Sequence, residues 1–403
     1  MILPASILVE GGRVKITNRI TPSRNAVLLL FFLHGVIFAT WVSRIPAVKN
    51  SLGLSASALG LSLLGVAIGS IPAMPLAGWL ISHHGSRLVT IVASLGFCLA
   101  LPGMAFASDA VTLGLALALF GATAGAMDVA MNAHGVAVER LVGRSTMSLF
   151  HAMFSLGGMT GAAVGGLVAG NGMGPQAHFI AVCAFALLCT LLSVRGLLPA
   201  SVDATPHGPA FARITRPLLG LGILAFCFLL SEGVMADWTA VYLRQSLHAD
   251  PGTAASGYAF FSAAMALGRL MGDRLVDRFG SAFLVRAGSA LAAAGLSIAL
   301  GFHTVGSAFA GFAAVGAGFS VIVPILFGAA GRAGGGAGIA AVTTTGYFGF
   351  LAGPPVIGFV ADAINLRAAL GILIALSLVG VLLGGAVNAG EQRGFPAAAL
   401  EDK

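Results

Sequence analysis

The sequence predicts an all-α membrane protein with twelve transmembrane helices in two pseudo-symmetric six-helix bundles. Of its 403 residues, 58% are hydrophobic and 9% are charged, whereas soluble domains average about 25% charged residues. The apolar residues gather in runs of the ~20 residues that a helix needs to cross a bilayer. One long polar gap divides these runs into six and six, which gives the two bundles.

The spans follow one another with short gaps. Those of the first half are predicted at 26–47, 56–81, 88–107, 111–137, 146–170 and 177–198, and those of the second at 217–244, 253–273, 282–301, 305–330, 338–361 and 367–388. The expected domains are an N-terminal tail (1–25), a first bundle (26–198), a linker (199–216), a second bundle (217–388) and a C-terminal tail (389–403). No small-residue cleavage site follows the first span, so the N-terminal tail is interpreted as uncleaved and not as a signal peptide.

Basic residues predict the orientation of the spans. Seventeen Lys and Arg residues fall on the side of the N-terminus or at its membrane edge, and four fall on the opposite side. Cytoplasmic loops carry the excess of Lys and Arg, so both termini are expected in the cytoplasm, with the spans in a bacterial inner membrane. The seventeen are Arg13, Lys15, Arg19, Arg24, Arg87, Arg140, Arg144, Arg195, Arg213, Arg216, Arg269, Arg274, Arg278, Arg286, Arg332, Arg393 and Lys403; the four are Arg44, Lys49, Arg244 and Arg367.

Motif searches argue against other classes of protein. The four cysteines lie inside apolar runs without Cys-x2-Cys spacing, so neither a metal site nor a disulfide framework is expected. A phosphate-binding Gly-x4-Gly-Lys-Ser/Thr loop is missing, which argues against ATP-driven transport. Neither His-Glu-x2-His nor Gly-x-Ser-x-Gly occurs, so no enzyme activity is expected. The net charge of +7 sits between spans and is attributed to topology and not to a nucleic-acid partner.

The two halves show signs of an internal repeat. A separation of 195 residues relates Gly85 to Gly280, and Gly121 to Gly316 in the same way; a separation of 197 relates two further pairs, Gly60 with Gly257 and Trp41 with Trp238. Chance matches among 57 glycines are common, but the chain has only three tryptophans. Parallel repeats of this kind place the solute path between the two halves, near the midplane of the membrane.

Two loops resemble a known family signature. The loop after the second span reads Gly78-Trp-Leu-Ile-Ser-His-His-Gly85-Ser-Arg87. It resembles the Gly-x3-Asp-Arg-x-Gly-x-Arg signature of the major facilitator superfamily, with the Asp and the first Arg replaced. The corresponding loop after the eighth span keeps an Asp-Arg pair. The resemblance implies a gating role for six residues: Gly78, Gly85, Arg87, Asp273, Asp277 and Arg278.

Further motifs refine the resemblance. The run Gly157-x3-Gly161-Ala162-x2-Gly165 is similar to the antiporter motif of the superfamily, with Ala in place of its Pro. The first span and the motif Asp128-x3-Asn132 look like the fucose permease group. Fucose is not carried over as the solute, because Val42 stands where that group has an Asp. The neighbouring Asn-rich stretch of that group is replaced by Phe38, Ala39 and Trp41, which favours a less polar solute than a free sugar.

Two carboxylates inside the predicted spans are candidates for proton coupling. Ionisable groups are costly at membrane depth and by default face the interior of the bundle. Asp128 lies about half-way through the fourth span, and its counterpart in the repeat is Val323, so this carboxylate breaks the symmetry. A structural pairing with a helix neighbour is the alternative. Glu232 is the second candidate, in the seventh span.

Six further residues are candidates for solute binding. Asn132 lies one turn from Asp128, on the same face of the helix, while His34 and His151 lie at similar depth; each His could equally be a core residue. Trp41 and Trp238 could face each other across the central cavity and stack on a ligand, or they could be interfacial belt residues. Asp237 could contact the solute or pair with Arg44 or Arg244. The six are Trp41, His34, Asn132, His151, Trp238 and Asp237.

The sequence therefore predicts a secondary active transporter that moves a small solute by alternating access and is coupled to protons. Both directions stay open: import of a small polar solute, or export of a drug or metabolite by proton antiport. A non-transporting membrane sensor with the same fold is a further alternative. The expected partners are the small-molecule solute and the lipid bilayer, with the chain as a monomer. No cofactor is expected beyond the proton as coupling ion.

Overall fold

The computed structural model describes residues 20–143, 146–199 and 218–388, and these parts form helices joined by short loops. The predicted linker therefore lies almost wholly outside the described residues. The helices of the first half are α1 (Ile20–Ser51), α2 (Ala56–His84), α3 (Ser86–Ala100) with a 3-10 turn to Phe106, α4 (Ala110–Val142), α5 (Met147–Gly170) and α6 (Pro175–Ser193). Those of the second half are α7 (Leu219–Gln245), α8 (Pro251–Ala255), α9 (Gly257–Phe279), α10 (Ser281–Gly301), α11 (Val305–Phe319), α12 (Ile322–Ala363) and α13 (Leu366–Leu383).

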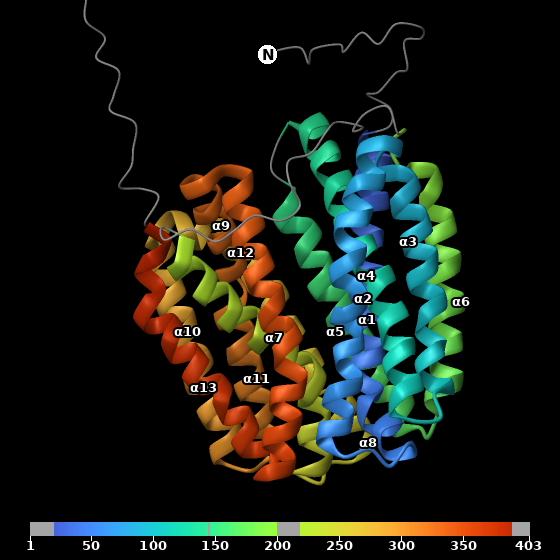
Figure 1. Ribbon diagram of the computed structural model, residues 1–403, viewed down its shortest axis with the longest axis vertical. Helices are drawn as coiled ribbons and strands as arrows, with labels where there is room; N and C mark the ends of the chain where they lie inside the picture. Colours follow the sequence, from blue (N-terminus) through green and yellow to red (C-terminus); the bar gives the residue numbers. More distant parts are fainter. Residues whose placement is uncertain (1–19, 144–145, 200–217, 389–403) are drawn as a thin grey trace, which may run out of the picture.

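The helices form two bundles that stand side by side (Figure 1). Helices α1–α6 make one bundle and α7–α13 the other, which confirms the predicted fold class. We call the end where α1 begins at Ile20 and α2 ends at His84 the upper face, and the end where α1 ends at Ser51 and α2 begins at Ala56 the lower face.

Ten helical segments within the described residues are long and apolar enough to cross a membrane. Helix α9 occupies the place of the eighth predicted span, but its second half carries several charged residues. The predicted spans 305–330 and 338–361 are not separated by a loop: α12 runs through both and bends at Gly335, whose φ of 59° is non-helical. Its Pro354 and Pro355, where a kink was expected, lie within helical backbone.

Helix ends confirm the internal repeat. Residues at equivalent positions, 195 apart, perform the same task in both halves, because Gly85 and Gly280 each end a helix with a φ near 75° (75° and 77°). This backbone conformation suits glycine, which has no side chain to clash. Asp109 and Thr304, again 195 apart, each begin a helix with a side-chain cap and a capping box. Such boxes satisfy N–H groups that the first helical turn leaves free.

Glycines bring helices of one bundle into backbone contact. A side chain at Gly121 of α4 would overlap the carbonyl oxygen of Val66 on α2, and one at Gly316 of α11 would overlap that of Phe261 on α9. Both partners of this contact are 195 residues apart, so the packing itself is repeated. Small residues at such crossings are typical of membrane helices, because they allow close approach.

We expect Gly121→Ala to destabilise the protein, because the new methyl group would force α2 and α4 apart. Overpacking of this kind costs about 1–3 kcal/mol. The melting temperature of the purified protein in detergent checks this. Gly371→Ala on α13 is the matched control, since nothing lies within 4 Å of an added methyl group there. Equal melting temperatures of the two variants would contradict the backbone contact.

The two bundles are joined at the lower face. Asp362, near the end of α12, accepts hydrogen bonds from the backbone N–H groups of Ala56 (3.0 Å) and Ser57 (2.8 Å) at the start of α2. We call this contact the Asp362 clasp. Nearby, Gly60 of α2 and Gly358 of α12 lie where a side chain would meet the backbone of the opposite bundle. Towards the upper face the ribbons of the two bundles diverge (Figure 1).

Candidate functional site

An ion pair lies at mid-depth, where the two bundles meet. Arg269 of α9 and Glu232 of α7 approach to 3.6 Å between Nη2 and Oε1, with side chains 12% and 20% exposed. The other Nη of Arg269 donates a hydrogen bond of 2.6 Å to the hydroxyl of Ser155 on α5, in the opposite bundle. A single guanidinium therefore connects a carboxylate of its own bundle with the other bundle.

Asp128 lies on α4 without a basic partner. The amide of Asn132 donates to the Asp128 carboxylate (3.1 Å) and to the backbone carbonyl of the same residue (2.8 Å). Tyr347 of α12, in the other bundle, is close enough to interact electrostatically with Asp128. Within the described residues the pair between Arg269 and Glu232 is the only ion pair, so the helix neighbour of Asp128 is a neutral amide and leaves the charge uncompensated.

The two candidate histidines occupy different environments. His151 of α5 is half-buried, packs edge-on against Phe31 at 5.4 Å between ring centroids and lies within electrostatic reach of Arg269. His34 of α1 is buried between the rings of Phe97 (4.9 Å) and Phe154 (5.4 Å), and its Nδ1 has no hydrogen-bond partner. Of the two, His151 belongs to the group around Arg269, and His34 is a core residue in this conformation.

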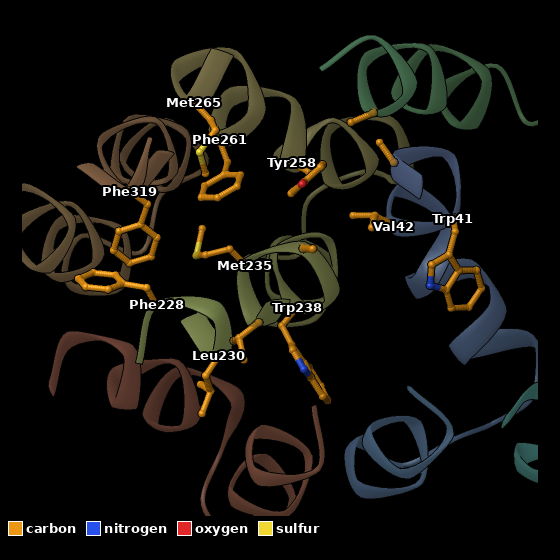
Figure 2. Packing of buried hydrophobic residues seen from close by; sticks show 14 of the residues in the cluster. Trp41, Val42, Phe228, Leu230, Met235, Trp238, Tyr258, Phe261, Met265 and Phe319 are labelled. Carbon is orange, nitrogen blue, oxygen red and sulfur yellow. The ribbon is translucent and has the colours of Figure 1, made fainter. Parts of the chain in front are cut away.

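The structure does not bring the two candidate tryptophans together. Trp41 and Trp238 are 1% and 0% exposed, and the Trp41 ring packs near Phe179 within its own bundle. Figure 2 shows Val42 on the side of α1 that faces Tyr258, with the Trp41 ring on another side of the helix. Neither indole is therefore available to a ligand, and neither lies in an exposed interfacial belt. Of the apolar residues expected to shape the site, Phe38 alone is partly exposed.

Asp237 is a buried carboxylate without the partner that the sequence suggested. Its exposure is 8%, and it forms no ion pair or hydrogen bond within the described residues. Arg44 instead donates from Nη2 to the carbonyl of Met173, and Arg244 donates from Nη1 to the carbonyl of Ala249 at 2.8 Å. The two arginines are therefore held by main-chain oxygens.

The residues of the two signature loops lie at the upper face. Arg87 donates to the carbonyls of Leu197 (3.3 Å) and Val194 (3.2 Å), which fastens the start of α3 to the end of α6. Ser148 of α5 donates weakly to Asp273 of α9 (3.5 Å), across the two bundles. Asp277 and Arg278 are exposed, and Gly78 has open space around it.

Sequence reasoning missed Arg269, Ser155 and Tyr347. Arg269 was counted at the membrane edge, although it lies four residues inside the predicted eighth span; the basic count is corrected to sixteen against four. A search for basic as well as acidic residues inside spans would have found it. Ser155 and Tyr347 carry no charge signal. Their role depends on contacts between the bundles, which a linear pattern does not contain.

Two bundles with ionisable groups at mid-depth along their interface define a polytopic membrane transport protein. The chain belongs to the Major Facilitator Superfamily: the model of that family matches residues 26–335 and 221–393. Metal-binding clusters of three or more His, Cys, Asp or Glu residues are absent from the described parts of the chain.

Curated relatives agree with this family. The chain is 40% identical over 354 residues to an uncharacterized MFS-type transporter of Yersinia pestis, which covers 87% of this chain and 92% of the relative. It is 34% identical over 361 residues to the membrane protein MosC of Rhizobium meliloti, with 88% and 87% covered.

Solved structures share the fold. The nucleoside transporter NupG superposes with a TM-score of 0.71 at 14% identity, covering 90% of this chain and 98% of that one. A bacterial homologue of the human lysosomal transporter Spinster, in an inward-facing conformation, gives 0.71 at 13% identity, with 96% and 100% covered. The transporter FucP in its outward conformation gives 0.60 at 18% identity, with 90% and 97% covered.

Proposed function

We propose that this transporter moves a small solute by alternating access and couples that movement to protons. The observation that carries the proposal is the uncompensated carboxylate of Asp128, half-buried on α4 with only a neutral amide as its side-chain hydrogen-bond partner. Because a charge at membrane depth is costly without a counter-charge, uptake of a proton relieves that cost. Tyr347 of the opposite bundle lies within electrostatic reach, so the protonation state of Asp128 acts on the interface between the bundles.

Glu232 offers a second coupling step. In the ionised form it holds Arg269 by charge attraction, while Arg269 also donates to Ser155 across the interface. A proton on Glu232 removes that attraction and leaves the guanidinium free to bind the solute or to remain with Ser155. Among the related folds, FucP is described as a fucose:proton symporter, which is consistent with proton coupling on this architecture.

For the solute, the group around Arg269 is the best-supported binding region. Asn132, His151, Glu232 and Arg269 offer hydrogen-bond donors and acceptors at similar depth, and Phe38 offers an apolar ring near Tyr258, 6.4 Å away between centroids. A solute with both polar and apolar parts suits this lining. The loss of Trp41 and Val42 from the accessible surface removes most of the support for an apolar solute.

The function is tested on purified protein in sealed liposomes. A thermal-shift screen first finds solutes that stabilise the fold, since a ligand that binds only the folded state raises its stability. Flux of each such solute is then measured with and without an imposed pH gradient. Accumulation that follows the gradient supports proton-coupled import, and gradient-driven efflux supports antiport. Binding without any flux would favour a sensor on this fold and overturn the proposal.

We propose that the upper face is cytoplasmic and that the membrane is the bacterial inner membrane. Sixteen basic residues fall on that side against four on the other, and such an excess marks the cytoplasm. We expect a cysteine introduced by Thr205→Cys to resist an impermeant thiol reagent in intact cells. Ser108→Cys, at an exposed position of the lower face, is the matched control and should be labelled. The reverse labelling pattern would invert the orientation.

A further inference from the structure

A small cavity opens at the lower face between the two bundles. Its volume is about 190 Å³, room for roughly six water molecules at ~30 Å³ each. Its lining comes from α1, α5, α7 and the start of α8, and its polar side chains include two arginines, one from each bundle: Arg44 and Arg244. Among the described residues that line it, none is acidic. The cavity lies towards the outer end of α1 and α7 and is separate from the group around Arg269.

Arg44 is buried with part of its hydrogen-bonding capacity unused. Its exposure is 4%, its Nη2 donates to the carbonyl of Met173, and its Nε has no partner. A buried guanidinium that lacks a carboxylate carries a large desolvation cost. Five N–H donors in a planar fork match the oxygens of a carboxylate or phosphate group, and such a group would satisfy the charge.

Arg244 supplies the second positive charge. It donates to the carbonyl of Ala249 through Nη1 at 2.8 Å and forms no ion pair within the described residues. The nearby carboxylate of Asp250 is already engaged, because it accepts from the backbone N–H groups of Gly252 (2.9 Å) and Thr253 (3.0 Å). Two uncompensated guanidinium groups therefore line one small cavity.

We propose that this cavity is a binding site for a small anion that carries a carboxylate or phosphate group. The guanidinium groups of Arg44 and Arg244 hold the anion from opposite bundles. A bound anion thus joins α1 to α7 and stabilises the closed lower face, because a ligand shifts an equilibrium towards the state that it binds more tightly. The inference does not depend on proton coupling or on the solute of the central site.

The test is anion-dependent stability of the purified full-length protein. Inorganic phosphate and acetate are titrated in neutral detergent, with chloride at the same ionic strength as reference. We expect a saturable rise in melting temperature of about 2–4 °C above that in chloride. The rise should vanish in Arg44→Gln and in Arg244→Gln. Arg367→Gln, an exposed arginine at the same face outside the cavity, should keep it.

Other outcomes separate the sources of the anion or overturn the site. A rise in phosphatidylglycerol nanodiscs over phosphatidylcholine nanodiscs, sensitive to Arg244→Gln, assigns the same chemistry to a lipid headgroup. If Arg44→Gln fails to fold, Arg244→Gln decides alone, since Arg244 is the less buried of the two. No rise with either probe, the same rise in every variant, or an equal rise with chloride would overturn the site.

Discussion

Asp128→Asn is expected to abolish accumulation of the solute against its gradient while leaving downhill flux and exchange measurable. Asparagine resembles the protonated carboxyl group in shape and neutrality, so the carrier would stay in one protonation state and lose the driving force of the pH gradient. The loss of gradient-driven accumulation should exceed tenfold. The measurement is solute accumulation in proteoliposomes with and without an imposed pH gradient.

The structure also predicts that this variant folds. The only side-chain partner of Asp128 is the amide of Asn132, so no opposite charge is left behind, and the change in stability should stay near the ~1 kcal/mol of a single hydrogen bond. Asp109→Asn, on the same helix but at its exposed first turn, is the matched control, because Asn caps a helix about as well as Asp. A folded Asp128→Asn protein that still concentrates solute would remove Asp128 from the coupling mechanism.

Arg269→Gln is expected to impair both stability and transport. The substitution leaves Glu232 without its partner and removes the donor to Ser155. Because the pair is mostly but not fully buried, the cost should lie at about 1–3 kcal/mol, between those of exposed and of fully buried pairs. Flux should fall at least tenfold, which uptake assays and melting curves of the same preparation measure together.

A double variant separates the two effects. Glu232→Gln with Arg269→Gln leaves no stranded charge, so the melting temperature should recover while transport remains lost; the excess over the single variants is the coupling energy of the pair. Arg140→Gln, an exposed arginine at the end of α4, controls for loss of positive charge. Recovery of gradient-driven flux in the double variant would reduce the ion pair to a structural role.

The sequence was sufficient for the fold because its signals are periodic and redundant. Apolar runs of full span length occur in both halves, and an offset of 195 residues relates caps such as Asp109 and Thr304 and contacts such as that of Gly121. The pair of Asp128 and Asn132 was also predictable, since residues four apart share a helix face, and the structure joins them.

The relation of the two halves to each other was harder to predict. Trp41 and Trp238 occupy matching positions, and equivalent positions in a repeat have equivalent surroundings, so both are buried in their own bundle and neither marks a site. Arg269 was placed at the membrane edge because span boundaries from sequence are uncertain by a few residues. Its partners come from α7 and α5, and only the three-dimensional packing identifies them.

The Asp362 clasp makes closure of the lower face a matter of helix capping. The first turn of α2 receives one cap from its own Ser55 and a second from a carboxylate of the other bundle. Each time the lower face opens, water has to replace the second cap, and caps of this kind are typically worth ~1 kcal/mol. That is about a fivefold bias in the ratio of the two conformations. The resting orientation of the carrier can therefore be tuned in evolution at one exposed residue, far from solute and proton, without altering what is transported.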